Sequence, residues 1–183
     1  MSILKVAKLG NPVLREIAKP IPLEEIKNSE IQRLIQDMIE TMREYEGVGL
    51  AAPQVHKSLQ ICVIESIDRS RGEDGNTTPL MVLINPVLTI VSENLHEDWE
   101  GCLSIPDLRG LVPRYRQIKV QAYDSSGRVV DFQAQDFLAR VIQHEHDHLM
   151  AKVFFDRMRS FESLSYLQEF ARYWQRKEGE NSG

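Results

Sequence analysis

The strongest chemical signal in the sequence is the segment QHEHDHL at 143–149, which contains the pattern His-Glu-x-x-His. If this segment is helical, His144 and His148 project from one face and can bind the same metal ion. Glu145 then lies close enough to exchange a proton with a water on that ion. Because the chain has five histidines and 27 acidic residues, a polar helix face without a metal is the alternative. The pattern favours a hydrolytic metal site.

Such a site needs a third protein ligand, because catalytic zinc-type sites have three protein ligands and one open position. Cys102 lies in EGCLS, after a glycine that allows the backbone to approach another group closely. A small buried hydrophobic residue is the alternative role. Cys62 lies in the apolar run LQICVI, which indicates a buried, unreactive thiol. Two cysteines in such different surroundings do not predict a disulfide, and Cys102 is the candidate ligand.

A third segment, GVGLAAPQ at 47–54, combines two glycines, an apolar bend and an amide side chain. Gly49 permits the backbone to approach a ligand closely, and the amide of Gln54 can donate hydrogen bonds to a developing oxyanion. By itself this segment is weak evidence, because a glycine-rich turn after a helix is commonly a C-terminal cap. Gly47 is expected to have that role.

Taken together and in this order, GxGLAAPQ, EGCLS and QHExDHL closely resemble the three signature motifs of the peptide deformylases, in particular of their bacterial and organellar type 1. LGNPVLR at 9–15 and FDR at 155–157 also resemble that family, so the resemblance covers about residues 3–160. It implies an enzyme that removes the N-formyl group from the N-terminal formylmethionine of newly made polypeptides and releases formate.

The resemblance and the chemistry of the residues assign Cys102, His144 and His148 as ligands of one divalent metal ion per chain. Thiolate and imidazole suit zinc, iron, cobalt and nickel. The family usually works with Fe²⁺, so Fe²⁺ is expected in the cell, and Zn²⁺, Ni²⁺ or Co²⁺ in a purified sample. Glu145 is the expected acid and base, which takes a proton from the attacking water and returns it to the leaving amine.

Further site residues follow from the resemblance and from helical spacing. The resemblance assigns the oxyanion donors to the Gln54 side chain and the Leu103 backbone N–H. Phe137 and Val141 lie seven and three residues before His144, so they share its helix face and are candidates for lining a methionine pocket. Ordinary core packing is the alternative role of these two residues. The substrate backbone is expected to contact Val48, Gly49, Gly101 and Arg109. For Arg109, the alternative is a solvated position on the surface.

The chain departs from the family pattern at three places. His146 stands where the family usually has an apolar residue, Ala151 where it has glycine, and His56 or Lys57 where another glycine is common. None of them removes a ligand or the acid/base residue, so the departures concern local loop geometry and pocket shape. His146 lies about 200° around the helix from the first histidine and cannot share its metal. We expect it to be a packed or solvated histidine.

Two other functions remain open. In the extended form of a His-Glu-x-x-His zinc protease, glycine and histidine would stand at 151 and 154, where this chain has Ala151 and Phe154. A downstream glutamate ligand would leave Glu169, which no supporting motif surrounds. A noncatalytic, metal-stabilised module that binds at the ribosome would normally need four protein ligands in a closed site. Only three stand in convincing contexts, and Glu145 would have no role there.

These residues must be positioned by secondary structure, and hydrophobic periodicity indicates where. Apolar residues at helical spacing, with a capping-box pattern at Ser29 and Gln32, predict a helix that ends before Gly47. Strands are expected at 59–65, 80–85 and 87–91, with an exposed loop at 66–79. Two further strands at 117–123 and 128–135 flank the turn DSSG. Helical spacing returns in the metal motif, from about 137 to 149, and at 161–177.

The expected fold class is α+β, a single domain at 1–183 in which antiparallel or mixed sheets pack around a central metal-binding helix, with helices near both ends. The catalytic core is expected at about 3–160, the C-terminal helix at about 161–177 and a frayed polar tail at 178–183. A length of 183 residues, of which 42% are hydrophobic, suits one domain with a substantial core.

Composition bounds the location and the partners. No apolar run approaches the roughly 18 residues that a membrane-spanning helix needs, and the net charge of −5 argues against general nucleic-acid binding. Two cysteines and the lack of an apolar leader favour a bacterial cytoplasm, although removal of a transit peptide would permit an organelle. The expected partners are N-formylmethionyl nascent polypeptides and, near the exit tunnel, the ribosome. No membrane partner is expected.

Overall fold

The computed structural model describes residues 2–66 and 78–175. Five strands form an antiparallel sheet in the order β1-β2-β3-β4-β5, and β6 pairs with β4 off this path. The strands are β1 (Gly49–Ala51), β2 (Ile61–Ser66), β3 (Thr78–Cys102), β4 (Ile105–Tyr123), β5 (Val129–Gln135) and β6 (Ser165–Tyr166), and the helices are α1 (Ser29–Glu44), α2 (Asp136–Leu149) and α3 (Leu167–Tyr173). Short 3-10 helices lie at Pro12–Arg15, Leu23–Glu25, Ala52–Val55 and Phe154–Arg157. This architecture confirms the predicted α+β class.

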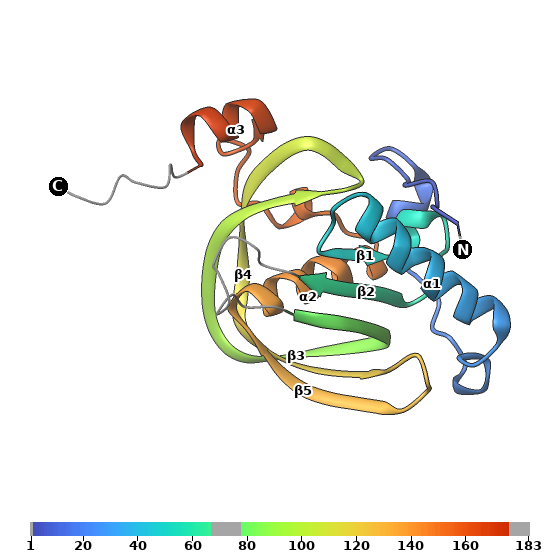
Figure 1. The fold of residues 1–183 in the computed structure, drawn as a ribbon. Helices are drawn as coiled ribbons and strands as arrows, with labels where there is room; N and C mark the ends of the chain where they lie inside the picture. Colours follow the sequence, from blue (N-terminus) through green and yellow to red (C-terminus); the bar gives the residue numbers. More distant parts are fainter. Residues whose placement is uncertain (1, 67–77, 176–183) are drawn as a thin grey trace.

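β3 and β4 form a long, bent hairpin that curves around α2 (Figure 1). The sequence predicted two strands, at 80–85 and 87–91, but β3 is continuous over 25 residues. The register shifts between Ile84 and Val87, and Asn85 has a φ of 51°, which marks the point where the prediction divided the strand. The later part of β3 was missed because its residues are mostly exposed, so apolar and polar residues do not alternate there.

β2 separates two hydrophobic cores, because successive side chains of a strand point to opposite faces of the sheet. Cys62 and Ile64 belong to the core that contains α2, and Ile61 and Val63 belong to the core that contains α1. The two helices therefore cover opposite faces of this part of the sheet. Cys62 is buried, as predicted, and this burial raises the pKa of its thiol well above the usual value.

α1 begins at Ser29 without the predicted capping box. Its N-cap residue is Asn28, which makes no side-chain cap bond. The Gln32 side chain donates hydrogen bonds to Ile26 O at 2.7 Å and Ser125 O at 2.9 Å. Gln32 therefore connects α1 to the turn between β4 and β5. Its side chain bonds to Ser125, which is distant in sequence, instead of making the predicted capping-box bond at the start of α1.

The C-terminus of α1 is a Schellman motif in which Glu46, and not the predicted Gly47, takes the left-handed conformation. The Gly47 N–H donates to Met42 O at 2.9 Å, and the Glu46 N–H donates to Arg43 O at 3.0 Å. The φ of Glu46 is 52°. Gly47 has a different role, since a Cβ at that position would lie 2.9 Å from Leu103 Cδ1. Its lack of a side chain allows the segment after α1 to approach the end of β3.

α2 carries the metal motif along the inside of the bent hairpin. It follows directly on β5 and ends at Leu149, as the spacing predicted. Ala139, Ile142 and Leu149 are fully buried and belong to the core between α2 and the sheet. The predicted turn between β4 and β5 is also confirmed, because Gly127 N–H donates to Asp124 O at 2.9 Å and Gly127 has a φ of 76°.

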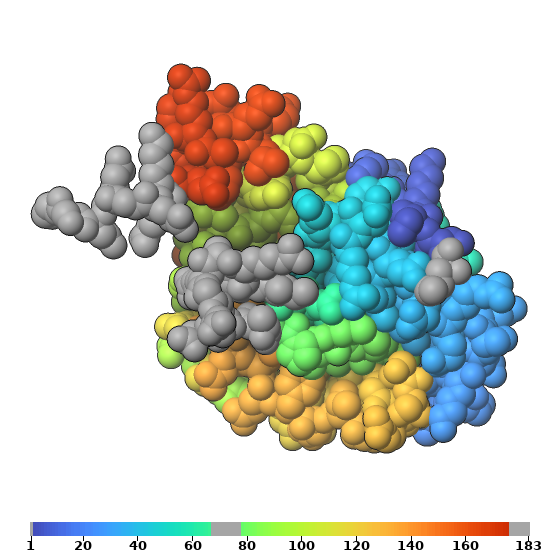
Figure 2. Space-filling model, in the orientation of Figure 1, coloured from blue at the N-terminus to red at the C-terminus, as the bar shows by residue number. Residues whose placement is uncertain are grey.

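The predicted helix at 161–177 is wrong at its start. Ser165 and Tyr166 form β6, which pairs with Arg109 and Leu108 of β4, and α3 covers only seven residues. Pairing with a strand distant in sequence outweighs the helical spacing of these residues, which periodicity alone could not reveal. α3 forms a lobe beside the bend of the β3–β4 hairpin (Figures 1 and 2). The end of the predicted helix and the tail at 178–183 lie outside the described residues.

The predicted loop at 66–79 is shorter at both ends, because β2 includes Ser66 and β3 begins at Thr78. Its centre, 67–77, lies outside the described residues. Within residues 2–66 and 78–175, no helix is both long enough and apolar enough to cross a bilayer.

Candidate active site

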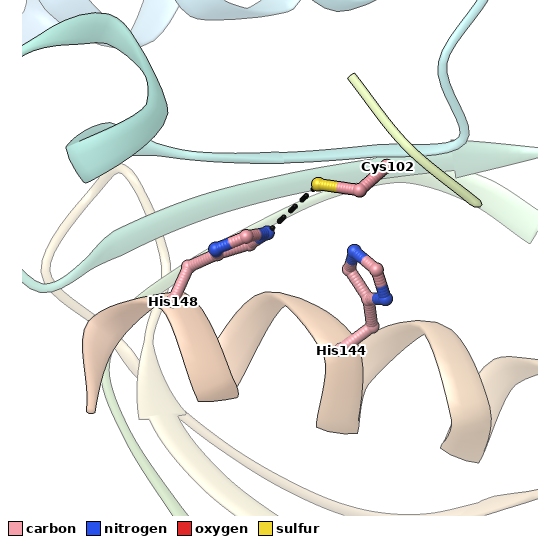
Figure 3. A group of neighbouring side chains, drawn as sticks. All are labelled: Cys102, His144 and His148. Atoms are coloured by element: carbon pink, nitrogen blue, oxygen red, sulfur yellow. Dashed lines mark hydrogen bonds between the residues drawn. The ribbon is translucent and has the colours of Figure 1, made fainter. Parts of the chain in front are cut away.

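Cys102, His144 and His148 converge at the end of β3, and we call them the Cys-His-His cluster (Figure 3). Their candidate ligand atoms all lie within 4.8 Å of one another. The Cys102 Sγ is 3.3 Å from His148 Nε2, and the two histidines lie one turn apart on α2 with ring centroids 5.2 Å apart. The structure therefore brings together the three residues that the sequence proposed as metal ligands.

Electrostatics at the cluster favour a thiolate. Burial would raise the pKa of the Cys102 thiol, but the imidazoles of His148 and His144 outweigh burial and lower this pKa well below its usual value. In the same way, burial would lower the pKa of His144, but hydrogen bonds and charges of Cys102 and Glu100 raise it. A thiolate and two imidazoles, which can release their protons to a metal, are a donor set that suits a divalent transition metal.

The ring nitrogens of the two histidines provide a test of fit that does not depend on the motif. His148 Nε2 faces Cys102 Sγ at 3.3 Å, and the other ring nitrogen, Nδ1, is buried with no hydrogen-bond partner within the described part of the chain. His144 Nδ1 lies 2.9 Å from Glu100 Oε2. Because the pKa of Glu100 is low, this carboxylate accepts, and His144 donates from Nδ1. The Nε2 lone pair of His144 is then free for a metal.

Glu145 is buried beside the cluster, and its Oε2 has no hydrogen-bond partner among the described residues. Burial raises the pKa of Glu145 to about 7, although the charges of His144 and His148 oppose the rise. A Cβ on Gly49 would overlap Glu145 Oε1, so the absence of a side chain there makes room for the carboxylate. A carboxyl group with a pKa near neutrality can both accept and return a proton.

The amide of Gln54 points at the cluster. Its Oε1 accepts a hydrogen bond from Ala51 N–H at 2.8 Å, which fixes the orientation of the amide group. Its Nε2 then donates to Cys102 Sγ at 3.4 Å and to Ser104 Oγ at 3.3 Å. Gln54 is buried, with 1% of its surface exposed. An oriented N–H donor beside the ligands is suited to an oxyanion.

A cavity of about 450 Å³ opens in front of the cluster. The predicted substrate residues that line it are Val48, Gly49, Gly101, Arg109, Phe137 and Val141, together with Gln54, Leu103 and Glu145. Phe137 is 48% exposed, whereas Val141 is buried. The half-buried guanidinium of Arg109 lies against Gly101, where a Cβ would overlap it, so Arg109 is not a freely solvated side chain.

Sequence reasoning missed a functional residue that stands two positions before Cys102. Glu100 is buried and accepts hydrogen bonds from Arg114 Nε at 2.9 Å and Arg140 Nη1 at 2.7 Å, in addition to His144. Burial would raise the pKa of Glu100, but His144 and Arg114 lower it. A carboxylate behind a liganding histidine orients the ring. Its place in the EGCLS motif was the only available signal.

Asp147 joins this group from the other side of α2. It accepts hydrogen bonds from Arg114 Nη1 at 2.5 Å and Arg157 Nη2 at 2.6 Å. Burial would raise the pKa of Asp147, but hydrogen bonds and charges of Arg157 and Arg114 lower it. Arg114 therefore links Glu100 to Asp147 and so connects β3, β4 and α2. Nothing in the spacing of the arginines predicted this link.

The family model described as polypeptide deformylase matches residues 3–163. The chain belongs to the polypeptide deformylase family. Peptide deformylase 2 of Pseudomonas putida is 44% identical over 167 residues, which are 91% of this chain and 93% of that protein. A class I type b peptide deformylase from Acinetobacter baumannii, with Met-Ala-Ser bound, aligns with a TM-score of 0.81 and 38% identity, over 86% of this chain and 100% of that one.

A plant protein is also similar to this deformylase. Peptide deformylase 1A, chloroplastic, of Solanum lycopersicum is 36% identical, over 88% of this chain and 62% of that protein. The family is metal-dependent, and this deformylase has a Cys-His-His cluster that could hold a metal ion.

Two of the expected departures from the family pattern, at His56 or Lys57 and at Ala151, include a residue with an unusual backbone conformation. His56 has a φ of 63° and Ala151 a φ of 61°, the left-handed region in which glycine is favoured. Each residue ends a helical segment: Lys57 N–H donates to Ala52 O at 3.0 Å, and Lys152 N–H donates to Asp147 O at 2.8 Å. His56 and Ala151 therefore carry side chains at positions where the left-handed backbone conformation favours glycine. The third departure, His146, lies outside the Cys-His-His cluster.

Proposed function

We propose that this deformylase removes the formyl group from formylmethionine at the N-terminus of newly made polypeptides and releases formate. The observation that carries the proposal is the buried carboxylate of Glu145, whose Oε2 has no hydrogen-bond partner among the described residues and which follows directly on His144. The relative from Acinetobacter baumannii has Met-Ala-Ser bound, the peptide that remains when formyl-Met-Ala-Ser loses its formyl group.

In the proposed reaction, Glu145 accepts a proton from the attacking water, whose oxygen forms a bond to the formyl carbon. The carbonyl oxygen becomes an oxyanion, and the Gln54 amide and the Leu103 backbone N–H donate hydrogen bonds to it. Glu145 then gives the proton to the nitrogen as the C–N bond breaks, which yields formate and a free amine. A divalent metal at the Cys-His-His cluster would lower the pKa of a water toward neutrality.

We further propose that the metal is Fe²⁺ in the cell. One thiolate and two imidazoles suit Fe²⁺, and they also accept Zn²⁺, Ni²⁺ and Co²⁺. Iron bound to a thiolate is easily lost by oxidation, so protein purified in air is expected to contain one of the other ions. Metal analysis of protein purified with and without oxygen distinguishes these cases.

The cavity supports a division of roles among the proposed substrate residues. Phe137 and Val141 lie on the face of α2 that also carries His144, and we assign to them the pocket for the methionine side chain. The backbone of the peptide is assigned to Val48, Gly49, Gly101 and Arg109. At both glycines, the space that a side chain would take is occupied by a site residue, Glu145 at Gly49 and Arg109 at Gly101.

Both alternative functions lack support in the site. The extended zinc protease motif requires histidine at 154, where Phe154 is buried and only 1% exposed. A noncatalytic metal site would not need a buried carboxyl group such as that of Glu145, whose Oε2 has no hydrogen-bond partner among the described residues, since that arrangement costs free energy of desolvation. Glu145 therefore favours catalysis over a purely structural metal site.

The decisive experiment measures formate release from formyl-Met-Ala-Ser by metal-loaded protein, with mass spectrometry of the peptide and of an unrelated denatured protein. We expect formate release, a peptide lighter by about 28 Da, the mass of one carbonyl group, and no fragments from the denatured protein. Fragments of the denatured protein would favour a protease. Metal binding without either reaction would favour a binding module.

The two cysteines provide a matched test of the metal site. Cys102→Ala should lose most of the metal, because one of three ligands is missing. Cys62→Ala should keep metal and activity and lower the free energy of unfolding by about 1 kcal/mol, the effect of a small buried cavity. Metal analysis and urea unfolding measure both effects. Equal metal loss in the two variants would contradict the proposed ligand set.

We place the activity where formylated chains leave the ribosome, in a bacterial cytoplasm. The relatives from bacteria support this location, and the chloroplastic relative makes an organelle the alternative. We also propose that residues 1–183 form one catalytic domain, because strands from residues 49 to 135 share one antiparallel sheet that carries Cys102, and α2, which carries His144 and His148, packs against this sheet in one core. Direct contact with the ribosome remains a prediction that a binding assay with purified ribosomes would test.

A further inference from the structure

The C-terminal segment contributes to the wall of the active-site cavity. Leu167, the first residue of α3, lines the cavity together with Trp99 of β3. The family model ends at residue 163, so Leu167 lies beyond the part of the chain that defines the family. This side of the cavity is therefore built partly by a segment outside the matched core.

Trp99 holds α3 in place. Its ring packs against Phe170 with centroids 4.8 Å apart and against Trp174 with centroids 5.7 Å apart. Tilted aromatic pairs at these distances attract one another. No residue of α3 is itself buried, so this aromatic cluster and the pairing of β6 with β4 are its main attachments. The orientation of the Trp99 ring and the position of Leu167 consequently depend on each other.

The position of Trp99 along β3 indicates which part of a substrate would reach it. Trp99 precedes Cys102 by three residues, which corresponds to about 10 Å of extended strand. An extended peptide whose formyl group lies at the Cys-His-His cluster spans the same distance in about three residues. Trp99 therefore lies at the depth of the third residue of the peptide.

We propose that Trp99 and Leu167 form a subsite for the side chain of the third residue of the formylated peptide and select an apolar side chain there. An indole ring and a leucine side chain offer apolar surface and no matching charge, so an apolar third residue gains from burial. Phe170 and Trp174 act as positioning residues, because they contact Trp99. The inference rests on the proposed deformylase activity and adds a substrate preference to it.

The test compares kcat/KM for formyl-Met-Ala-Leu, formyl-Met-Ala-Ser and formyl-Met-Leu-Ser. The native protein should favour leucine over serine at the third position by about fivefold, the effect of burying part of one leucine side chain. In Leu167→Ala and Trp99→Ala this ratio should fall to about twofold or less, mainly through KM. The effect of leucine at the second position should not change, and this readout separates a local subsite from a general loss of activity.

Tyr173→Ala is the matched control, because Tyr173 lies on the same helix, is 64% exposed and is not among the residues that line the cavity. The ratio of kcat/KM for leucine over serine at the third position should be the same in Tyr173→Ala as in the native protein. Phe170→Ala should reduce the ratio partly, since Trp99 would lose its contact with Phe170 and keep the one with Trp174. Leu167 is itself 37% exposed, so Leu167→Ala should fold. This variant tests the proposed subsite even if Trp99→Ala fails to fold.

Two results would overturn the inference. One is a native protein that shows no preference at the third residue, and the other is an unchanged preference in Leu167→Ala. Absence of formate from all three peptides would instead contradict the deformylase activity itself. The two failures are therefore distinguishable in one set of measurements.

Discussion

Glu145 is the residue on which the proposed chemistry depends most directly. Its carboxylate is buried next to the Cys-His-His cluster, and burial sets its pKa to about 7. Glu145→Gln keeps the size and hydrogen-bonding capacity of the side chain but cannot take up a proton. Turnover should fall by about 100-fold or more, while metal content stays unchanged. Formate release and metal analysis of the same sample test this expectation.

A variant elsewhere in the cavity provides the comparison for Glu145→Gln. Val48 lines the cavity and is 41% exposed, so Val48→Ala should change KM for formyl-Met-Ala-Ser by a few-fold and leave kcat nearly unchanged, as expected for a binding contact. Near-normal turnover of Glu145→Gln would show that another group moves the proton.

At the scale of single residues, the sequence could predict the residues proposed to carry the reaction but not those that support them. Cys102, His144 and Gln54 lie in short motifs whose residue types and spacing have a chemical meaning, and the structure brings them together. Glu100 and Arg114 have no such spacing, because they meet only when β3 and β4 pair and place both behind α2. Such contacts depend on the fold, and they cannot be predicted from the local patterns of a single sequence.

The end of α2 shows how one residue type affects the stability of an element. Ala151 takes a φ of 61°, which an L-residue with a Cβ adopts at a cost of about 1 kcal/mol. Ala151→Gly should therefore raise the free energy of unfolding by about 0.5 kcal/mol, after the greater flexibility of glycine in the unfolded chain is included. Equilibrium urea unfolding measures the difference.

Ala139 in the same helix serves as the control of opposite sign. It lies in the interior of α2 and is fully buried, so Ala139→Gly should lower the free energy of unfolding by about 1 kcal/mol. If both glycine variants were equally destabilised, the left-handed conformation of Ala151 would not be a source of strain.

The turn between β4 and β5 should show a pH-dependent contribution to stability. The Ser126 hydroxyl, followed by the backbone N–H groups of Arg128 and Ser126, holds the pKa of Asp124 at about 2, below its ordinary value of 3.8. A carboxyl whose pKa is lower in the folded protein stabilises the fold above its unfolded pKa. This contribution is present above about pH 4 and is lost as the pH falls toward 2.

Melting temperatures of the native protein and Asp124→Asn measure this contribution. The native protein should be the more stable of the two at pH 6, and the gap should narrow as the pH falls to 3, because protonated aspartate resembles asparagine. A gap that stays constant across this range would mean that the charge of Asp124 does not stabilise the turn.

Elements with a local cause were predictable, and elements with a distant cause were not. α2 and the β4–β5 turn follow from helical spacing and from DSSG, both of which act within a few residues. β6 forms because residues near 165 pair with β4 more than 50 positions away, and the Gln32 side chain donates a hydrogen bond to Ser125 O across 93 positions. Patterns within a few residues cannot predict pairings between residues that are distant in the sequence.

The whole molecule is held around the site by a buried network of charges. Arg114 joins Glu100 to Asp147 and is 4% exposed. Arg114→Met removes the cation that both carboxylates share, so Glu100 keeps only Arg140 and His144, and Asp147 keeps only Arg157, among the charged partners described above, and each buried carboxylate is left with less compensation. The free energy of unfolding should fall by about 3–5 kcal/mol. Urea unfolding of the metal-free protein measures this loss without a contribution from metal binding.

Arg116 lies two residues further along β4 and offers a close control. Its ion pair with Asp136 is exposed, with 53% and 58% of the two side chains accessible. Arg116→Met should change the free energy of unfolding by no more than about 0.5 kcal/mol. Similar losses in both variants would contradict the special role of the buried network.

The ligands of the proposed metal come from distant parts of the chain, since Cys102 and His148 are 46 residues apart. In the unfolded chain they are not held together, so an ion that needs all three ligands binds the folded form alone. Mass action then couples metal supply to the lifetime of the protein: free metal at 100 times its dissociation constant adds about 2.7 kcal/mol to the folded state. A cell short of this metal would hold the enzyme in a form that is both idle and more easily degraded.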